Sequence, residues 1–145
     1  MRTTRIRQII MTMIATLSLT SCEYSLPDGE WDPMDWQAEV ETNWQNSAFV
    51  IDAKGGEFVA SCSNYSKPWL SDAYTGGEYI KPRYEGEVCD FQKITADWFK
   101  AEIKDNILTV TFDSNQTNEI RPLKLTVTAG DIFYTFTFRQ SANSK

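Results

Sequence analysis

The stretch Leu123-Lys-Leu-Thr-Val-Thr-Ala-Gly-Asp-Ile-Phe-Tyr-Thr-Phe-Thr-Phe-Arg139 decides the fold. Apolar side chains occupy every second position on both sides of the tripeptide at 129–131. A period of two places these side chains on one face of a β-strand. Gly130 supplies the positive φ that a tight turn needs. The stretch therefore predicts an antiparallel hairpin with one buried face.

The same pattern continues upstream of this hairpin. Residues 108–112 (Leu-Thr-Val-Thr-Phe) form a third alternating segment, and residues 49–51 and 58–62 flank a glycine turn at 53–57. Short strands separated by turns over roughly 100 residues are typical of an immunoglobulin-like sandwich. We predict an all-β fold, an antiparallel immunoglobulin-like β-sandwich that forms one domain over residues 37–142, with no helix after Cys22.

The N-terminus has the pattern of an export signal. Three arginines among the first seven residues precede an apolar run at 9–19, and the small residues Thr20 and Ser21 precede Cys22. The apolar run fits a signal peptide and is too short for a bilayer span, which needs ~20 residues. We predict a lipoprotein signal peptide at 1–21 and lipidation of Cys22, which would tether the exported chain to a membrane.

Residues 22–36 mix acids, proline and glycine without apolar periodicity and predict a lipidated, solvated tether. Four acids from Asp28 to Glu39 have the spacing of positions 1, 3, 5 and 12 of a calcium loop (Asp28, Glu30, Asp32 and Glu39). Position 6 is Pro33, where that loop needs glycine. We therefore predict an acidic stalk and no metal site.

Charge and composition exclude several classes of function. Loss of residues 1–21 removes three of the 14 basic residues and none of the 20 acids, so the net charge moves from −6 to −9. An acidic chain lacks the basic footprint of nucleic-acid binding. The chain contains no histidine, which removes the usual nucleophile and zinc arrangements. We predict no nucleic-acid partner and no cofactor.

A carboxylate pair is the one catalytic scheme that the composition leaves open. Its members would come from five acids in the second half of the chain (Asp72, Glu78, Glu85, Glu87 and Asp90). Solvated surface acids explain these residues equally well, and no motif accompanies them. We therefore predict that the protein is not an enzyme and has no catalytic residues.

Two cysteines remain once Cys22 is lipidated. Cys62 and Cys89 would form an even pair in an oxidising compartment, and closing the loop between them would add roughly 3.5 kcal/mol on the loop-entropy model. We predict a Cys62–Cys89 disulfide. Two separate thiols, each behaving as a small hydrophobe, are the alternative.

The segment from Tyr65 to Tyr84 is rich in aromatic residues. Rings on a connection beside polar groups are suited to binding a ligand, and we take Tyr74, Tyr79 and Tyr84 as ligand-binding candidates. Packing over a sheet edge is the simpler role for these three rings. For Trp69 we predict a core position, by analogy with the buried tryptophan of immunoglobulin-type sandwiches.

Several of these residues together resemble a known family, the Bacteroidetes-associated carbohydrate-binding often N-terminal (BACON) domain. The resemblance spans about residues 37–142 and rests on the order of Gly55-Gly56, Trp69, Asp97-Trp98, the strand at 108–112, Asn115, Arg121, Leu125-Thr-Val-Thr-Ala-Gly130 and Phe136-Thr-Phe-Arg-Gln140. It implies an immunoglobulin-like fold and a core position for Trp98. It also implies that Gln140 completes backbone hydrogen bonds at the end of the last strand. The segment 73–94 is longer than the family pattern requires.

The resemblance also implies a cellular location and a binding partner. It indicates a lipoprotein held in the outer membrane, on the periplasmic or the cell-surface face, that binds a glycan or an envelope protein. The alternative is a structural spacer or subunit of a cell-envelope complex that binds no glycan. We assign Asn115 to a turn and expect Arg121 either to cap the strand that follows or to pair with a carboxylate.

Overall fold

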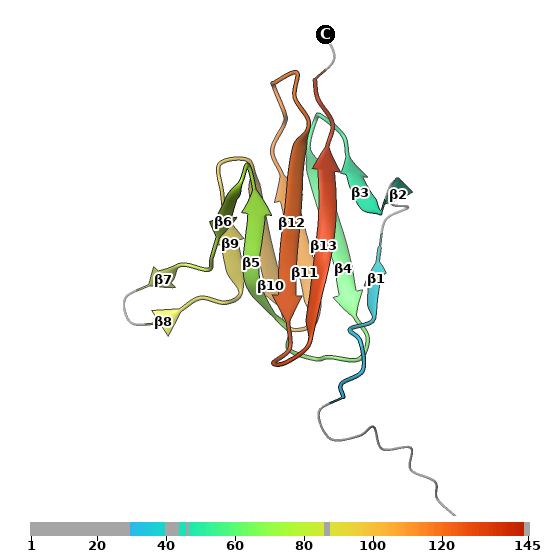
Figure 1. Cartoon of the computed structure of the whole chain (residues 1–145), viewed down its shortest axis with the longest axis vertical. Coiled ribbons are helices and arrows are strands. Elements are labelled where there is room, and N and C mark those ends of the chain that lie inside the picture. The colour runs from blue at the N-terminus through green and yellow to red at the C-terminus, as the bar shows by residue number, and fades with distance from the viewer. Residues whose placement is uncertain (1–29, 40–43, 46, 86–87, 144–145) are drawn as a thin grey trace, which may run out of the picture. The chain divides into compact units, whose positions relative to one another are not determined.

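The computed structural model describes residues 30–39, 44–45, 47–85 and 88–143. In this part of the chain every regular element is a β-strand, and none of it forms an apolar helix long enough to cross a bilayer. Residues Trp31–Lys145 group into one compact unit. Its strands form two main sheets that face each other (Figure 1). The predicted all-β sandwich is confirmed.

The first sheet has five antiparallel strands in the order β1 (Trp36–Ala38), β4 (Gly56–Cys62), β11 (Ile107–Phe112), β10 (Phe99–Lys104) and β9 (Lys93–Thr95). The second has the order β2 (Trp44–Gln45), β3 (Ala48–Ile51), β13 (Phe133–Gln140), β12 (Arg121–Thr128), β5 (Trp69–Thr75) and β6 (Glu78–Ile80). Its pairings are antiparallel except that β3 runs parallel to β13.

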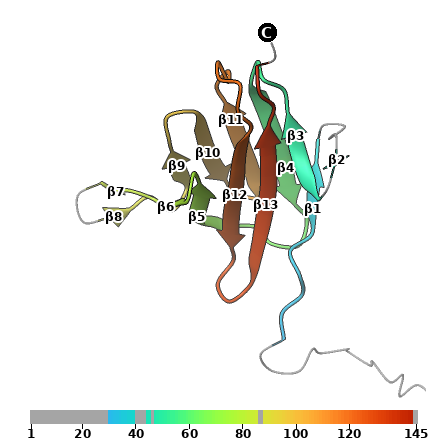
Figure 2. The same ribbon diagram turned by 45° about the horizontal axis from the view of Figure 1, so that its top comes forward.

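A small hairpin of β7 (Tyr84–Glu85) and β8 (Val88–Cys89) forms a separate two-stranded sheet. We call this hairpin the arm. Both ribbon views show it extending from the side of the sandwich where β5, β6 and β9 lie (Figures 1 and 2).

The hairpin predicted at 123–139 is β12 and β13. In β12 the side chains of Leu123, Leu125 and Val127 are fully buried, while Lys124 between them is exposed. At the turn the Ala129 amide donates to the Ile132 carbonyl oxygen over 3.1 Å, and Gly130 has a φ of 93°. The alternation of the sequence therefore separates core from solvent as expected.

Phenylalanine rings from both sheets fill the centre of the core. The Phe138 ring of β13 lies 4.9 Å from that of Phe58 on β4 and 5.3 Å from that of Phe112 on β11, measured between centroids. Phe136, on the same strand, makes an edge-on contact of 5.7 Å with Phe58. Offset and edge-on contacts of this kind stabilise beyond the burial of area alone.

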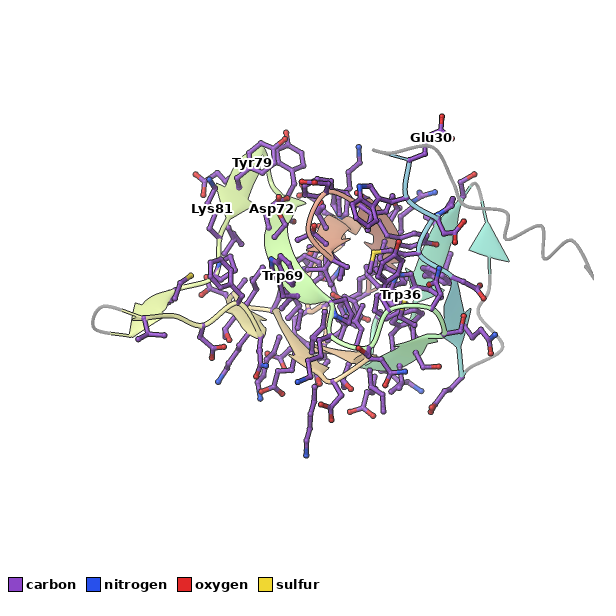
Figure 3. The ribbon with its side chains drawn as sticks, turned by 90° about the horizontal axis from the view of Figure 1, so that it is seen from below. Glu30, Trp36, Trp69, Asp72, Tyr79 and Lys81 are labelled. Atoms are coloured by element: carbon purple, nitrogen blue, oxygen red, sulfur yellow. The ribbon has the colours of Figure 1, made fainter. Side chains whose placement is uncertain are left out.

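The folded domain begins earlier than residue 37. Met34 is buried in the core, and Trp36 pairs with Cys62 in β1 and places its ring 5.2 Å from that of Phe136. Figure 3 shows Trp36 among the side chains between the two sheets. The predicted tether at 22–36 is therefore wrong at its C-terminal end. Met34 and Trp36 stand among acids and a proline without the alternation of a strand, so the sequence did not indicate that they pack in or against the core.

Asn115 lies in a turn and Gln140 completes a backbone hydrogen bond at the end of β13, as predicted. The buried Asn115 amide donates to the Glu119 and Ser141 carbonyl oxygens at 2.7 and 2.9 Å, and its Oδ1 accepts from the Thr117 amide at 3.0 Å. Gln140, fully buried, donates from Nε2 to the Asp113 carbonyl oxygen at 2.6 Å. These bonds satisfy backbone groups that the strands leave unpaired.

Candidate functional site

Tyr74 and Tyr79 lie on two paired strands. The sequence predicted a connection here, but the segment folds into the β5–β6 hairpin, in which Tyr74 is directly opposite Tyr79. Gly76 and Gly77 form its two-residue turn with φ values of 59° and 87°. A Gly-Gly pair between residues of high β propensity is a hairpin signal. That signal could have identified the hairpin.

The two tyrosine rings form an exposed pair on the outer side of the second sheet. Their centroids are 4.8 Å apart with an interplanar angle of 50°, and Tyr79 is 70% exposed. Lys124 of β12 stands opposite Tyr74, and Asp72, two residues earlier on β5, shares its face. Figure 3 shows Tyr79, Asp72 and Lys81 on the same side of β5 and β6. We call these five residues the tyrosine platform (Asp72, Tyr74, Tyr79, Lys81 and Lys124).

The platform has the chemistry of a polar recognition surface. Its two rings offer flat apolar area at a low cost in side-chain entropy, and their hydroxyls stay available for hydrogen bonds. The ammonium groups of Lys81 and Lys124 donate, and the carboxylate of Asp72 accepts. Asp72 already accepts a hydrogen bond of 2.9 Å from the Ser71 hydroxyl. Such a surface can stack on a ligand and bond its polar groups.

Two predicted site residues stand apart from this surface. Tyr84 belongs to β7 of the arm and pairs with Cys89, so its backbone is outside the β5–β6 hairpin; its side chain lies outside the described residues. Cys22 and the signal peptide at 1–21 also lie outside the described residues.

The predicted Cys62–Cys89 disulfide is absent from the structure, in which both thiols are free. Cys62 is buried on β4, and Cys89 is on the arm that precedes β9. The Cys62 thiol donates to Asn64 Oδ1 at 3.4 Å, and the Cys89 thiol donates to the Pro82 carbonyl oxygen at 3.7 Å. The two cysteines therefore behave as separate thiols, which is the alternative role considered for them.

Trp69 and Trp98 have different environments. Trp98 packs against the core, as predicted, and the Arg121 guanidinium lies 5.5 Å from its ring centroid. Arg121 thus makes a cation–π contact, which differs from both roles expected for it. Trp69 is 37% exposed at the start of β5, so its predicted core position is wrong. Phenylalanines occupy the centre of the core instead.

Trp69 borders a cleft that the sequence did not reveal. The cleft has a volume of about 650 Å³ and lies between the start of β5, strand β8 of the arm with the segment after it, and the β10–β11 turn. Its lining includes Lys67, Trp69, Asp90, Phe91, Gln92 and Asp105. We call it the arm cleft. These residues are far apart in the chain, and no motif in the sequence links them.

The five acids considered for catalysis are distributed over different elements. Asp72 belongs to the platform, Glu78 to β6 and Asp90 to the arm cleft, while the side chains of Glu85 and Glu87 lie outside the described residues. Asp90 holds its own turn by accepting from the Gln92 amide at 3.0 Å. Within the described ranges no three potential metal ligands gather at one point.

Comparison with known proteins gives one solved structure with a similar fold and sequence. It is an NMR structure of a protein from Bacteroides thetaiotaomicron, 32% identical to this chain, with a TM-score of 0.66. The match covers 86% of this chain and 99% of that chain. No family model matches the sequence. No curated protein matches it either.

Proposed function

Because this chain belongs to the same family as the Bacteroides thetaiotaomicron protein, we propose that it is a lipid-anchored, non-catalytic domain of the bacterial outer membrane that binds a glycan. The leader of this chain supports an envelope role, because it has the order of a lipoprotein signal. The sandwich is consistent with the BACON-like character that the sequence suggests.

The tyrosine platform is the observation that carries the glycan proposal. Tyr79 is 70% exposed although it is a large ring on a regular strand, so core packing does not account for its position. Its partner Tyr74 and the neighbouring Lys124 add a second ring and a donor on the same face. A sugar offers an apolar C–H face for the rings and hydroxyls for the polar groups.

We expect Tyr79→Ala to weaken glycan binding strongly. Loss of a stacking ring at a binding hot spot costs at least ~2 kcal/mol, which corresponds to about thirtyfold in Kd. Because Tyr79 is mostly exposed, the melting temperature should hardly change. A glycan array followed by titration of the best ligand, with the full chain in detergent, measures the effect.

Phe133→Ala is the matched control for this experiment. Phe133 is 59% exposed on β13, where it pairs with Thr128, four residues along β12 from Lys124, so its loss removes an exposed ring outside the platform. It should leave the affinity unchanged. If Tyr74→Ala and Tyr79→Ala both bind the glycan as tightly as the wild type, the platform is not the site. If no glycan binds and an envelope pull-down returns a protein partner, the spacer or subunit role replaces the proposal.

The anchor has a separate test. Metabolic labelling of cells with a clickable palmitate should mark the wild-type protein and leave Cys22→Ala unmarked, because the thiol of Cys22 is the only proposed acceptor. Each buried acyl CH₂ contributes ~0.8 kcal/mol to membrane binding, so several chains hold the protein stably. The variant should therefore also leave the membrane fraction. Equal label on both proteins would contradict the lipoprotein assignment.

A further inference from the structure

Residues 90–92, which line the arm cleft, form one hydrogen bond to each of the two main sheets. The Leu70 amide of β5 donates to the Phe91 carbonyl oxygen at 2.8 Å, and the Ile103 amide of β10 donates to the Gln92 carbonyl oxygen at 2.8 Å. The carboxylate of Asp90 also accepts from the Gln92 amide. The segment 90–92 thus joins the sheets and is ordered before any ligand arrives, which lowers the entropic cost of binding.

Two aromatic rings are exposed in this hollow. Trp69 is 37% exposed and Phe91 is 48% exposed, and both line the arm cleft. The hydrogen bond between Leu70 and Phe91 keeps the two rings on adjoining backbone. Exposed rings on a concave, fixed surface are suited to stack on the flat C–H face of a ligand.

The polar side chains of the cleft carry charges of both signs. Lys67 contributes a positive charge, and Asp90 and Asp105 contribute negative charges. Because these charges nearly cancel, the cleft offers little net attraction to a strongly charged ligand. Hydroxyl groups both donate and accept, so they can pair with the ammonium group, the carboxylates and the Gln92 amide alike.

We infer that the arm cleft is a second glycan subsite, separate from the tyrosine platform, that binds a neutral sugar unit. Its volume of about 650 Å³ falls within the roughly 300–1,000 Å³ range of small-molecule sites. This inference rests on the proposed glycan-binding function and adds a location and a ligand class to it.

The test follows Trp69 directly in the full chain, purified in detergent. The probes are short neutral oligosaccharides of glucose, mannose and xylose, with sialylated and sulfated glycans as charged probes. In a ¹H–¹⁵N spectrum the Trp69 indole cross-peak, assigned by its loss in Trp69→Phe, should shift with a neutral probe.

We expect Trp69→Ala and Phe91→Ala to weaken binding of the neutral probe roughly thirtyfold. Trp69→Phe keeps a ring and should retain most of the affinity. Phe133→Ala should bind normally.

The outcomes separate the two proposals. A Trp69 cross-peak that no neutral probe moves, or that only charged glycans move, overturns the inference. If Tyr79→Ala weakens binding while Trp69→Ala and Phe91→Ala bind as tightly as the wild type, the arm cleft is not a subsite and the platform stands. If only the cleft variants lose affinity, the inference stands and the platform loses its role. Phe91→Ala alters an exposed side chain, so it tests the cleft even if Trp69→Ala folds poorly.

Discussion

Replacing Phe138 with alanine should destabilise the protein by about 3–5 kcal/mol, the usual cost of removing a large ring from a core. The Phe138 side chain is fully buried, and its ring centroid lies within 5.6 Å of those of Phe49, Phe58 and Phe112, which come from three different strands. Backbone held in two sheets cannot collapse into the space that the ring leaves. Domains are typically stable by only ~5–15 kcal/mol, so this single change removes much of the total.

Urea denaturation of the full chain measures the loss as a lower midpoint at an unchanged slope. Phe133→Ala is the control, because it removes the same ring from the same strand at a position that is 59% exposed. Its midpoint should stay close to that of the wild type. Equal midpoints for the two variants would contradict the assignment of Phe138 to the centre of the core.

The second large effect is expected for Gly55→Ala, in the turn between β3 and β4. Gly55 has a φ of 82°, and a Cβ atom there would overlap the Phe112 carbonyl oxygen and lie 2.9 Å from the Asp113 carbonyl carbon. Both neighbours are backbone atoms and cannot rotate away. The positive φ costs ~1–2 kcal/mol and overpacking ~1–3 kcal/mol. We therefore expect a loss of about 2–5 kcal/mol.

Gly76→Ala separates these two contributions. Gly76 also has a positive φ, 59°, but no atom lies within 4 Å of a Cβ built on it. This variant should lose only the ~1–2 kcal/mol of the dihedral term. Thermal or urea unfolding of the two variants side by side gives the difference. If both variants lose the same free energy of unfolding, the contact of a Cβ at position 55 with the end of β11 has no cost.

The strands that alternate strictly were predictable from the sequence. Leu108, Val110 and Phe112 point into the core as their spacing indicates, and the glycine turns at 55 and 130 lie where expected. A strand has two faces and a fixed period, so a local pattern is enough to say which side chains are buried. Segments without the pattern were misjudged: Met34 and Trp36 were placed in the tether, and the β5–β6 hairpin in a connection.

The sequence by itself therefore determined the all-β class, the hairpin of β12 and β13 and which side chains of these strands are buried, because these follow from a local period of two. Only the tertiary structure decided the sites. Lys124 stands beside Tyr74 because β12 pairs with β5, and Trp69 lies near Phe91 because a backbone bond joins β5 to the segment after the arm. Cys62 and Cys89 remain free thiols on strands of two different sheets, β4 and β8. The order of strands in a sheet depends on long-range pairing, and no local period in one sequence encodes it.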